Sequence, residues 1–157
     1  MAELSESRIV RCPYNLARGY LAKALAPRIE SGKSERLTLT ANVAGGELEK
    51  DVLVTFGAAT DPMHFDQPWR IHWKPDGVPY PEFDGELTVR ADETYETAQL
   101  ELKGSYRPPG GALGAAFDWA VGSHIATGTA RALLHRIGTD MESRYRHDEA
   151  AKEGSPS

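Results

Sequence analysis

Residues 98–141 read AQLELKGSYRPPGGALGAAFDWAVGSHIATGTARALLHRIGTDM, and this stretch decides the fold. In its first ten residues apolar and polar side chains alternate, which is typical of a strand with one buried face. A Pro-Pro-Gly-Gly sequence at residues 108–111 then interrupts the pattern. About 30 residues follow without a proline, and their apolar positions recur every three or four residues, as in an amphipathic helix. The stretch therefore predicts a strand, a break and one long helix over residues 111–145.

Upstream segments show the same alternation and predict further strands. They are residues 36–43, 48–56, 69–74 and 85–91, with turn sequences such as Gly45-Gly46 between them. Consecutive strands joined by short turns predict an antiparallel meander. One side of this sheet is charged, so the long helix is expected to cover the other. The residues expected to face the helix include Leu39, Val54, Ile71, Val89 and Leu102.

The two ends of the chain complete the predicted domain. Residues 7–11 are expected to form a short edge strand, and Pro13 opens a small helix that Pro27 limits. Past Arg146 the chain is polar, so residues 147–157 are expected to be a disordered tail. The sequence thus predicts a single α+β domain over residues 1–146.

Composition excludes several classes of protein. With 157 residues, 40% hydrophobic and 26% charged, the chain is long enough for one domain with a substantial core. Its net charge of −5 lacks the basic footprint that nucleic acids select, so no nucleic-acid partner is expected. No stretch approaches the roughly 18 apolar residues of a membrane span, and the first residues lack the apolar core of a signal peptide. We therefore expect a cytoplasmic protein with no membrane span.

The segment from Gly104 to Asp118, continuing into Ile125-Ala126, resembles the last strand, connecting loop and helix start of bacterial members of the START and birch-pollen-allergen superfamily, also called SRPBCC. The order of elements over residues 5–145 is similar as well. This resemblance implies a helix-grip fold, in which a curved antiparallel sheet of six or seven strands wraps around one long C-terminal helix. Because the superfamily usually has seven strands and the pattern predicts six, either residues 61–68 or 78–83 hold the seventh, or an edge strand is missing.

The resemblance also implies a cavity between sheet and helix, which the superfamily uses for lipids, sterols, polyketides and other apolar ligands. Small residues along the helix favour open space there, namely Ala112, Ala116, Ala120, Gly128 and Ala132. Alternatively, large aromatic side chains fill the gap and make a solid core. On the first interpretation the partner is a small apolar molecule. The residues expected to bind it are Phe56, Trp69, Ile71, Trp73, Phe83, Val89, Leu102, Phe117, Val121 and His124.

No pattern in the sequence identifies a catalytic residue, and neither a cofactor nor a metal is expected. The histidines lack the HExxH or HxxxH spacing of a metal site. His124 either offers a ligand a polar contact or a general base, or it is a histidine at the edge of the core. Asp118 is expected to complement the helix dipole, and residues 110–114 to act as a hinge rather than as a phosphate cradle. Cys12 is expected to be a buried structural thiol rather than a nucleophile.

Three functions remain open at this stage. The first is binding or carriage of a small apolar or aromatic molecule, lipid-like or polyketide-like. The second is an enzyme of the polyketide-cyclase or dehydratase type, in which His124 with Tyr14 or Tyr106 would do acid and base work on a bound ketone. The third is a protein-interaction module whose core is filled. Polar side chains that converge inside the cavity would favour the enzyme.

Overall fold

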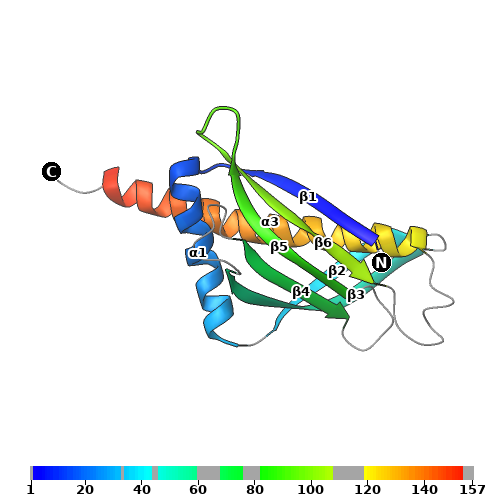
Figure 1. The fold of residues 1–157 in the computed structure, drawn as a ribbon. Helices are drawn as coiled ribbons and strands as arrows, with labels where there is room; N and C mark the ends of the chain where they lie inside the picture. Colours follow the sequence, from blue (N-terminus) through cyan, green and yellow to red (C-terminus); the bar gives the residue numbers. More distant parts are fainter. Residues whose placement is uncertain are drawn as a thin grey trace.

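The structure, a computed structural model, shows a curled sheet with helices α1 and α3 in the part of the chain that it describes (Figure 1). It describes residues 2–32, 34–43, 46–59, 68–75, 82–107 and 119–153. Side chains are described over these ranges except at residues 2, 39–43, 46–50, 58–59, 75, 119–125 and 153. The elements in chain order are β1 (Ala2–Val10), α1 (Tyr14–Glu30), β2 (Glu35–Val43), β3 (Gly46–Ala59), β4 (Trp69–Pro75), β5 (Glu82–Ala91), β6 (Ala98–Arg107) and α3 (Trp119–Glu153).

The described strands form one sheet in the order β1-β6-β5-β4-β3-β2, and every neighbouring pair is antiparallel. The predicted meander is therefore confirmed, with β1 added at the edge beside β6. Of the two places proposed for a seventh strand, residues 82–83 belong to β5. Residues 61–67 and 78–81 lie outside the described residues.

Helix α3 contacts both edge strands of the curled sheet (Figure 1). Its Arg131 Nε lies 3.2 Å from Glu6 Oε2 on β1. Its Arg136 Nη1 donates to the backbone carbonyl of Arg36 on β2 at 3.1 Å. The Arg136 guanidinium thus satisfies a backbone acceptor on an edge strand, a position where such groups otherwise stay unpaired. The helix bridges the two edges of the sheet, and the predicted helix-grip fold is confirmed.

A partly buried ionic cluster, the Arg28 clamp, joins α1, β2 and α3. Arg28 Nε lies 3.1 Å from Glu35 Oε2, and Arg28 Nη1 lies 3.0 Å from Asp140 Oδ2. Arg136 also approaches Glu35, at 3.6 Å. Burial disfavours the charged guanidinium, but the hydrogen bonds to Asp140 and Glu35 more than offset it, so the pKa of Arg28 is raised. The clamp fixes the C-terminal end of α1 to the middle of α3.

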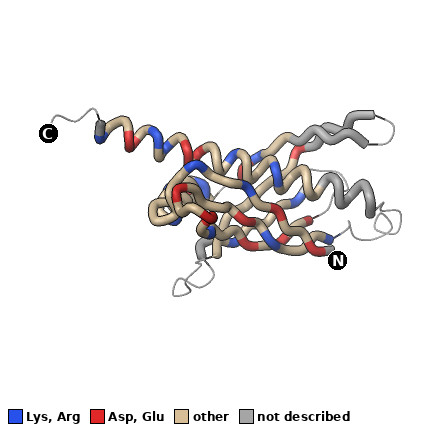
Figure 2. The backbone as a smooth tube through the Cα atoms, turned by 90° about the horizontal axis from the view of Figure 1, so that it is seen from above, with Lys and Arg blue, Asp and Glu red and all other residues tan. Residues whose placement is uncertain are grey.

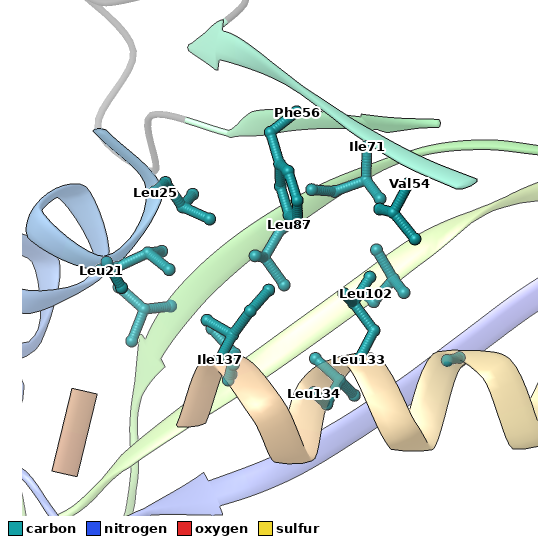
Figure 3. Packing of buried hydrophobic residues seen from close by; sticks show 14 of the residues in the cluster. Leu21, Leu25, Val54, Phe56, Ile71, Leu87, Leu102, Leu133, Leu134 and Ile137 are labelled. Atoms are coloured by element: carbon teal, nitrogen blue, oxygen red, sulfur yellow. The ribbon is translucent and has the colours of Figure 1, made fainter. Parts of the chain in front are cut away.

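One contiguous core lies between the sheet and α3, as Figure 3 shows. Of the residues predicted to face the helix, Val54, Ile71, Val89 and Leu102 are buried, which confirms the alternation in β3 to β6. The side chain of Leu39 lies outside the described residues. From the other side α1 contributes Leu21 and Leu25, and α3 contributes Leu133, Leu134 and Ile137.

The predicted face of the long helix is wrong in part. Gly128 was placed on the sheet-facing side, but it is exposed, and Ala132 is only partly buried. Residues 126–132 read ATGTARA, so no large apolar residue near Gly128 distinguishes one face of the helix from another. The bulky residues that follow fix its rotation. The buried stripe of α3 is Ala126, Ala130, Leu133, Leu134, Ile137 and Met141.

Helix α1 was predicted to stop at Pro27, but it continues to Glu30. Proline lacks a backbone N–H and therefore removes one hydrogen bond of the helix. Near this point Arg28 Nη1 donates to the carbonyl of Ala24 at 2.6 Å, and the backbone N–H of Ser31 donates to the carbonyl of Pro27 at 3.1 Å. These bonds, together with the Arg28 clamp, stabilise the last turn of the helix.

Two boundaries near the chain ends also differ from the prediction. Strand β1 begins at Ala2 rather than at residue 7. Helix α3 continues to Glu153, so the prediction of a disordered tail is wrong for residues 147–153. Tyr20 Oη donates to Asp148 Oδ2 at 2.7 Å and ties this end of the helix to α1. Basic and acidic residues are interspersed along these last turns (Figure 2). No described helix is both long and apolar enough to cross a membrane.

The observed rotation of α3 predicts that Gly128→Ala stabilises the protein. Gly128 lies in the interior of the helix, and a Cβ added there meets no atom within 4 Å. Alanine should therefore raise the free energy of unfolding by about 0.5–1 kcal/mol, measured by urea denaturation. Gly138→Ala is the matched control, because its added Cβ would lie 3.4 Å from the Arg8 side chain. A loss of stability in Gly128→Ala would mean that this residue packs on the sheet after all.

Candidate functional site

The inner face of the sheet carries a row of three aromatic side chains, which we call the aromatic row. Its members are Trp73 on β4, Phe83 on β5 and Tyr106 on β6, and the register pairs Trp73 with Phe83 and Phe83 with Tyr106. Their exposed fractions are 0%, 0% and 4%. The rings of Trp73 and Phe83 are stacked, with centroids 4.1 Å apart and an interplanar angle of 17°. The three side chains form a buried aromatic cluster across three neighbouring strands.

Two glycines make room for this surface. Gly85 and Gly104 are cross-strand partners in the row next to the aromatic row. A Cβ added to Gly104 would clash with the Asp84 carbonyl and would lie 2.7 Å from Phe83 Cζ. One added to Gly85 would clash with the Lys103 carbonyl and would lie 2.7 Å from Phe83 Cε1. Only glycine therefore allows the Phe83 ring to lie over this part of the sheet.

The contacts of α3 with β1 place the aromatic row level with the first turns of the helix. Arg131 meets Glu6, and Gly138 lies beside Arg8, so the helix and β1 run in the same direction. Ala2 is the β1 partner of Tyr106 and lies four residues, or about 13 Å, before Glu6. That length corresponds to about nine helical residues before Arg131. The large buried residues of α3, from Leu133 onward, lie beyond Arg131 and away from the row.

Trp73 carries a buried polar atom without a partner. Among the described residues, two buried side-chain nitrogen atoms lack a hydrogen-bond partner, Trp73 Nε1 and Arg8 Nε. A guanidinium has further N–H groups, whereas the indole has one donor and no alternative. The Trp73 end of the aromatic row therefore presents an unpaired hydrogen-bond donor.

Most of the predicted ligand-binding residues lie in the core. Phe56, Ile71, Trp73, Phe83, Val89 and Leu102 belong to one buried cluster, and Trp69 is partly buried against it. Figure 3 shows Phe56, Ile71 and Leu102 directed toward the helix, among Leu133, Leu134 and Ile137. Phe117 lies outside the described residues, as do the side chains of Val121 and His124 on α3.

The sequence prediction missed Gly85 and Gly104. Each occupies an inward position of an alternating strand, between residues that are buried. A glycine at such a position is the available signal for close approach of another group. The register makes the two glycines cross-strand partners, and the Phe83 ring covers both of them. Neither fact could be predicted from one strand alone.

Tyr14 and Tyr106, the tyrosines proposed as acid or base beside His124, lie at opposite ends of the sheet. Tyr106 pairs with Ala2 at the start of β1, whereas Tyr14 follows the end of β1 at Val10. Eight residues of strand separate these ends, which is about 26 Å. The ring of Tyr14 instead packs edge-on against Tyr95, with centroids 6.2 Å apart. Tyr14 therefore cannot act on a molecule that contacts the aromatic row.

Three hollows lined by described residues lie outside the space between sheet and helix. One of about 410 Å³ lies on the outer face of β3, β4 and β5, where His72 Nδ1 is 2.7 Å from Asp84 Oδ1. A second, of about 380 Å³, adjoins the Arg28 clamp, and a third, of about 320 Å³, lies beside Lys23 and His147. No cluster of three His, Cys, Asp or Glu residues in the described part of the chain could hold a metal ion.

Cys12 is fully buried, in agreement with a structural thiol. Burial, and to a smaller extent the charge of Glu142, raises its pKa from 9.0 to about 11. A thiolate is the reactive form of cysteine, so the thiol is unreactive near neutral pH.

Comparison with known proteins concerns the fold. No protein-family model and no curated protein matches the sequence. The crystal structure of TTHA0849 from Thermus thermophilus matches with a TM-score of 0.51 and 16% identity, over 91% of this chain and 99% of that chain. At 16% identity this likeness is one of fold. A START superfamily protein from Mycobacterium smegmatis matches at a TM-score of 0.45 and 8% identity, over 92% of this chain and 97% of that one.

A third structure, the di-domain ARO/CYC BexL from the BE-7585A biosynthetic pathway, has a TM-score of 0.43 and 20% identity. The match covers 95% of this chain but 47% of that one. The chain therefore spans about half of the two-domain protein. At these identities the likeness is one of fold.

The close contact at the glycine pair predicts that Gly104→Ala destabilises the protein. The added methyl group must displace backbone atoms or the Phe83 ring, which should lower the free energy of unfolding by about 1–3 kcal/mol. Near-ultraviolet circular dichroism should also lose intensity, since the stack of Trp73 on Phe83 is disturbed. The control is Gly19→Ala in α1, where an added Cβ meets no atom within 4 Å. Unchanged stability in Gly104→Ala would contradict the close approach.

The pKa of Cys12 predicts slow alkylation of the folded protein. A rise from 9.0 to about 11 lowers the thiolate fraction at pH 8 by about 100-fold. The rate with iodoacetamide, followed by mass spectrometry, should therefore be at least about 100-fold lower in the folded protein than in urea. Equal rates in the two states would show that Cys12 is accessible and ionised.

Proposed function

We propose that the protein binds a small apolar or aromatic molecule between the sheet and the first turns of α3. The observation that supports this most directly is the aromatic row, which lies level with those turns and away from Leu133, Leu134 and Ile137, large buried residues in the described part of the helix. Large rigid rings provide contact area at a low cost in side-chain entropy. The neighbouring glycine pair makes room for the Phe83 ring of this row.

The inner face of β4, β5 and β6 favours an uncharged ligand. Its described inward residues, from Ile71 to Tyr106, include no charged side chain. An ion placed there would lose its hydration without gaining a partner, which is strongly unfavourable. An uncharged molecule with a flat ring system would instead replace water on an apolar surface, at a gain of about 25 cal/mol per Å² buried.

Catalysis of the polyketide-cyclase type is the second candidate. It is favoured by the presence of a phenol, Tyr106, in the aromatic row itself. In that function Tyr106 would act as the acid or base toward a bound ketone, without Tyr14. Turnover of a ketone substrate that is lost in Tyr106→Phe, with binding retained, would distinguish the enzyme from a carrier.

The proposed site can be tested by filling it. Ala126 is buried on α3, about 7 Å before Arg131 along the helix and therefore level with the glycine pair. Ala126→Leu should weaken binding of the uncharged fluorescent probe N-phenyl-1-naphthylamine at least about tenfold, while it lowers the free energy of unfolding by less than about 1 kcal/mol. Titration of probe fluorescence and urea denaturation on the same variant provide the two values.

Ala130→Leu is the matched control, one turn further along the buried stripe and nearer to Leu133 and Leu134. Here the added methylenes meet a packed core, so a loss of about 1–3 kcal/mol is expected without a specific effect on the probe. If the wild-type protein binds no probe and both variants are equally destabilised, the space is filled, and the interaction module becomes the better hypothesis.

A further inference from the structure

The indole N–H of Trp73 is a buried hydrogen-bond donor without an acceptor among the described residues. The indole is 0% exposed, so water at the protein surface does not reach it. Its Nε1 has no hydrogen-bond partner among the described residues. A buried donor in this state costs about 1–3 kcal/mol relative to a paired one. Such groups are rare in native proteins, and each has a specific reason, such as a bound molecule that supplies the missing acceptor.

The stack on Phe83 fixes the direction of this donor. The two ring centroids are 4.1 Å apart and the ring planes are inclined by only 17°. The Trp73 ring therefore cannot tilt out of this plane without meeting Phe83. Its N–H points along the plane of the ring, since the donor lies in the indole plane. The described inward neighbours on the adjacent strands, Val54, Phe56 and Phe83, carry no acceptor side chain. No described residue supplies an acceptor, and a molecule that lies beside the ring would supply one.

We propose that Trp73 Nε1–H donates a hydrogen bond to a neutral oxygen acceptor of the ligand. The ligand class is then a flat aromatic or polycyclic molecule that carries a ketone or similar carbonyl at the end that meets Trp73. A pure hydrocarbon would leave the donor unpaired, and a carboxylate would bring an unpaired charge into an apolar site. Trp73 is thus a specificity-determining residue, and this inference rests on the proposed function of the site.

Two matched probes test the inference. The first is 6-propionyl-2-(dimethylamino)naphthalene, whose emission shifts to the red when its carbonyl accepts a hydrogen bond. The second is 6-propyl-2-(dimethylamino)naphthalene, which has a methylene group in place of the carbonyl. We expect the ketone to bind the wild-type protein about tenfold more tightly than the carbonyl-free probe. In Trp73→Phe the ketone should lose that factor and its emission should shift to the blue, while the affinity of the carbonyl-free probe stays within about twofold.

Trp69→Phe is the matched control, because it makes the same chemical change on the same face of β4. It should leave the preference for the ketone intact. Nuclear magnetic resonance of the wild-type protein provides a second readout that does not depend on the fold of a variant. The chain has three tryptophans, so ¹⁵N-labelled protein has three indole signals. The Trp73 signal should move downfield with the ketone and not with the carbonyl-free probe.

The outcomes separate the two proposals. If both probes bind with equal affinity and the Trp73 indole signal responds to neither of them, the donor role is overturned while the binding function stands. If neither probe binds the wild-type protein, the proposed function itself fails. A preference for the ketone that persists in Trp73→Phe would also overturn the assignment, because another group would then donate the hydrogen bond.

Discussion

The contact of the Phe83 ring with Gly85 and Gly104 is the constraint on which the inner face of the sheet depends. A side chain on either glycine would meet the backbone of the neighbouring strand as well as the ring. With both positions empty, Phe83 lies over the sheet and supports the indole of Trp73 at stacking distance. The stack in turn gives the Trp73 N–H a fixed direction. Thus the choice of glycine on two strands determines how the indole donor of Trp73 is placed on a mainly apolar surface.

The contacts that fix α3 to the rest of the fold are concentrated around the Arg28 clamp, away from the aromatic row. The Arg28 clamp joins three elements there, and its charges are only partly exposed, so salt screens them less than it screens surface pairs such as Arg36–Asp51. The same region contains the large residues of α3, which pack against Leu21 and Leu25 of α1 (Figure 3). Fixing the helix at this end places its first turns level with the aromatic row. Stability and ligand contact can therefore be supplied by different parts of one helix.

The sequence predicted those features that a single repeating pattern determines. Alternation of period two gave the inward faces of β3 to β6 correctly, because shifting a strand by one residue would exchange its buried and charged sides. The rotation of α3 about its axis was harder to predict, because residues 126–132 (ATGTARA) include no large apolar side chain that distinguishes one face. Gly128 was misplaced as a result. The continuation of α1 past Pro27 was missed for another reason. It depends on Arg28 finding Glu35 and Asp140, and these partners are 7 and 112 residues away.

The candidate site was predictable only in composition, because its arrangement depends on pairing between strands. Trp73 and Phe83 were expected to face the helix, but the row they form with Tyr106 arises from the register of three strands. Trp73 and Tyr106 lie on either side of Phe83, two strand spacings or about 10 Å apart. That distance is close to the length of two or three fused six-membered rings. A flat molecule of this size that spans the row would accept a hydrogen bond from Trp73 at one end and approach the phenol of Tyr106 at the other. The spacing of the row therefore favours a polycyclic ligand over a long flexible chain, since a chain would lose its conformational freedom to meet the same two points.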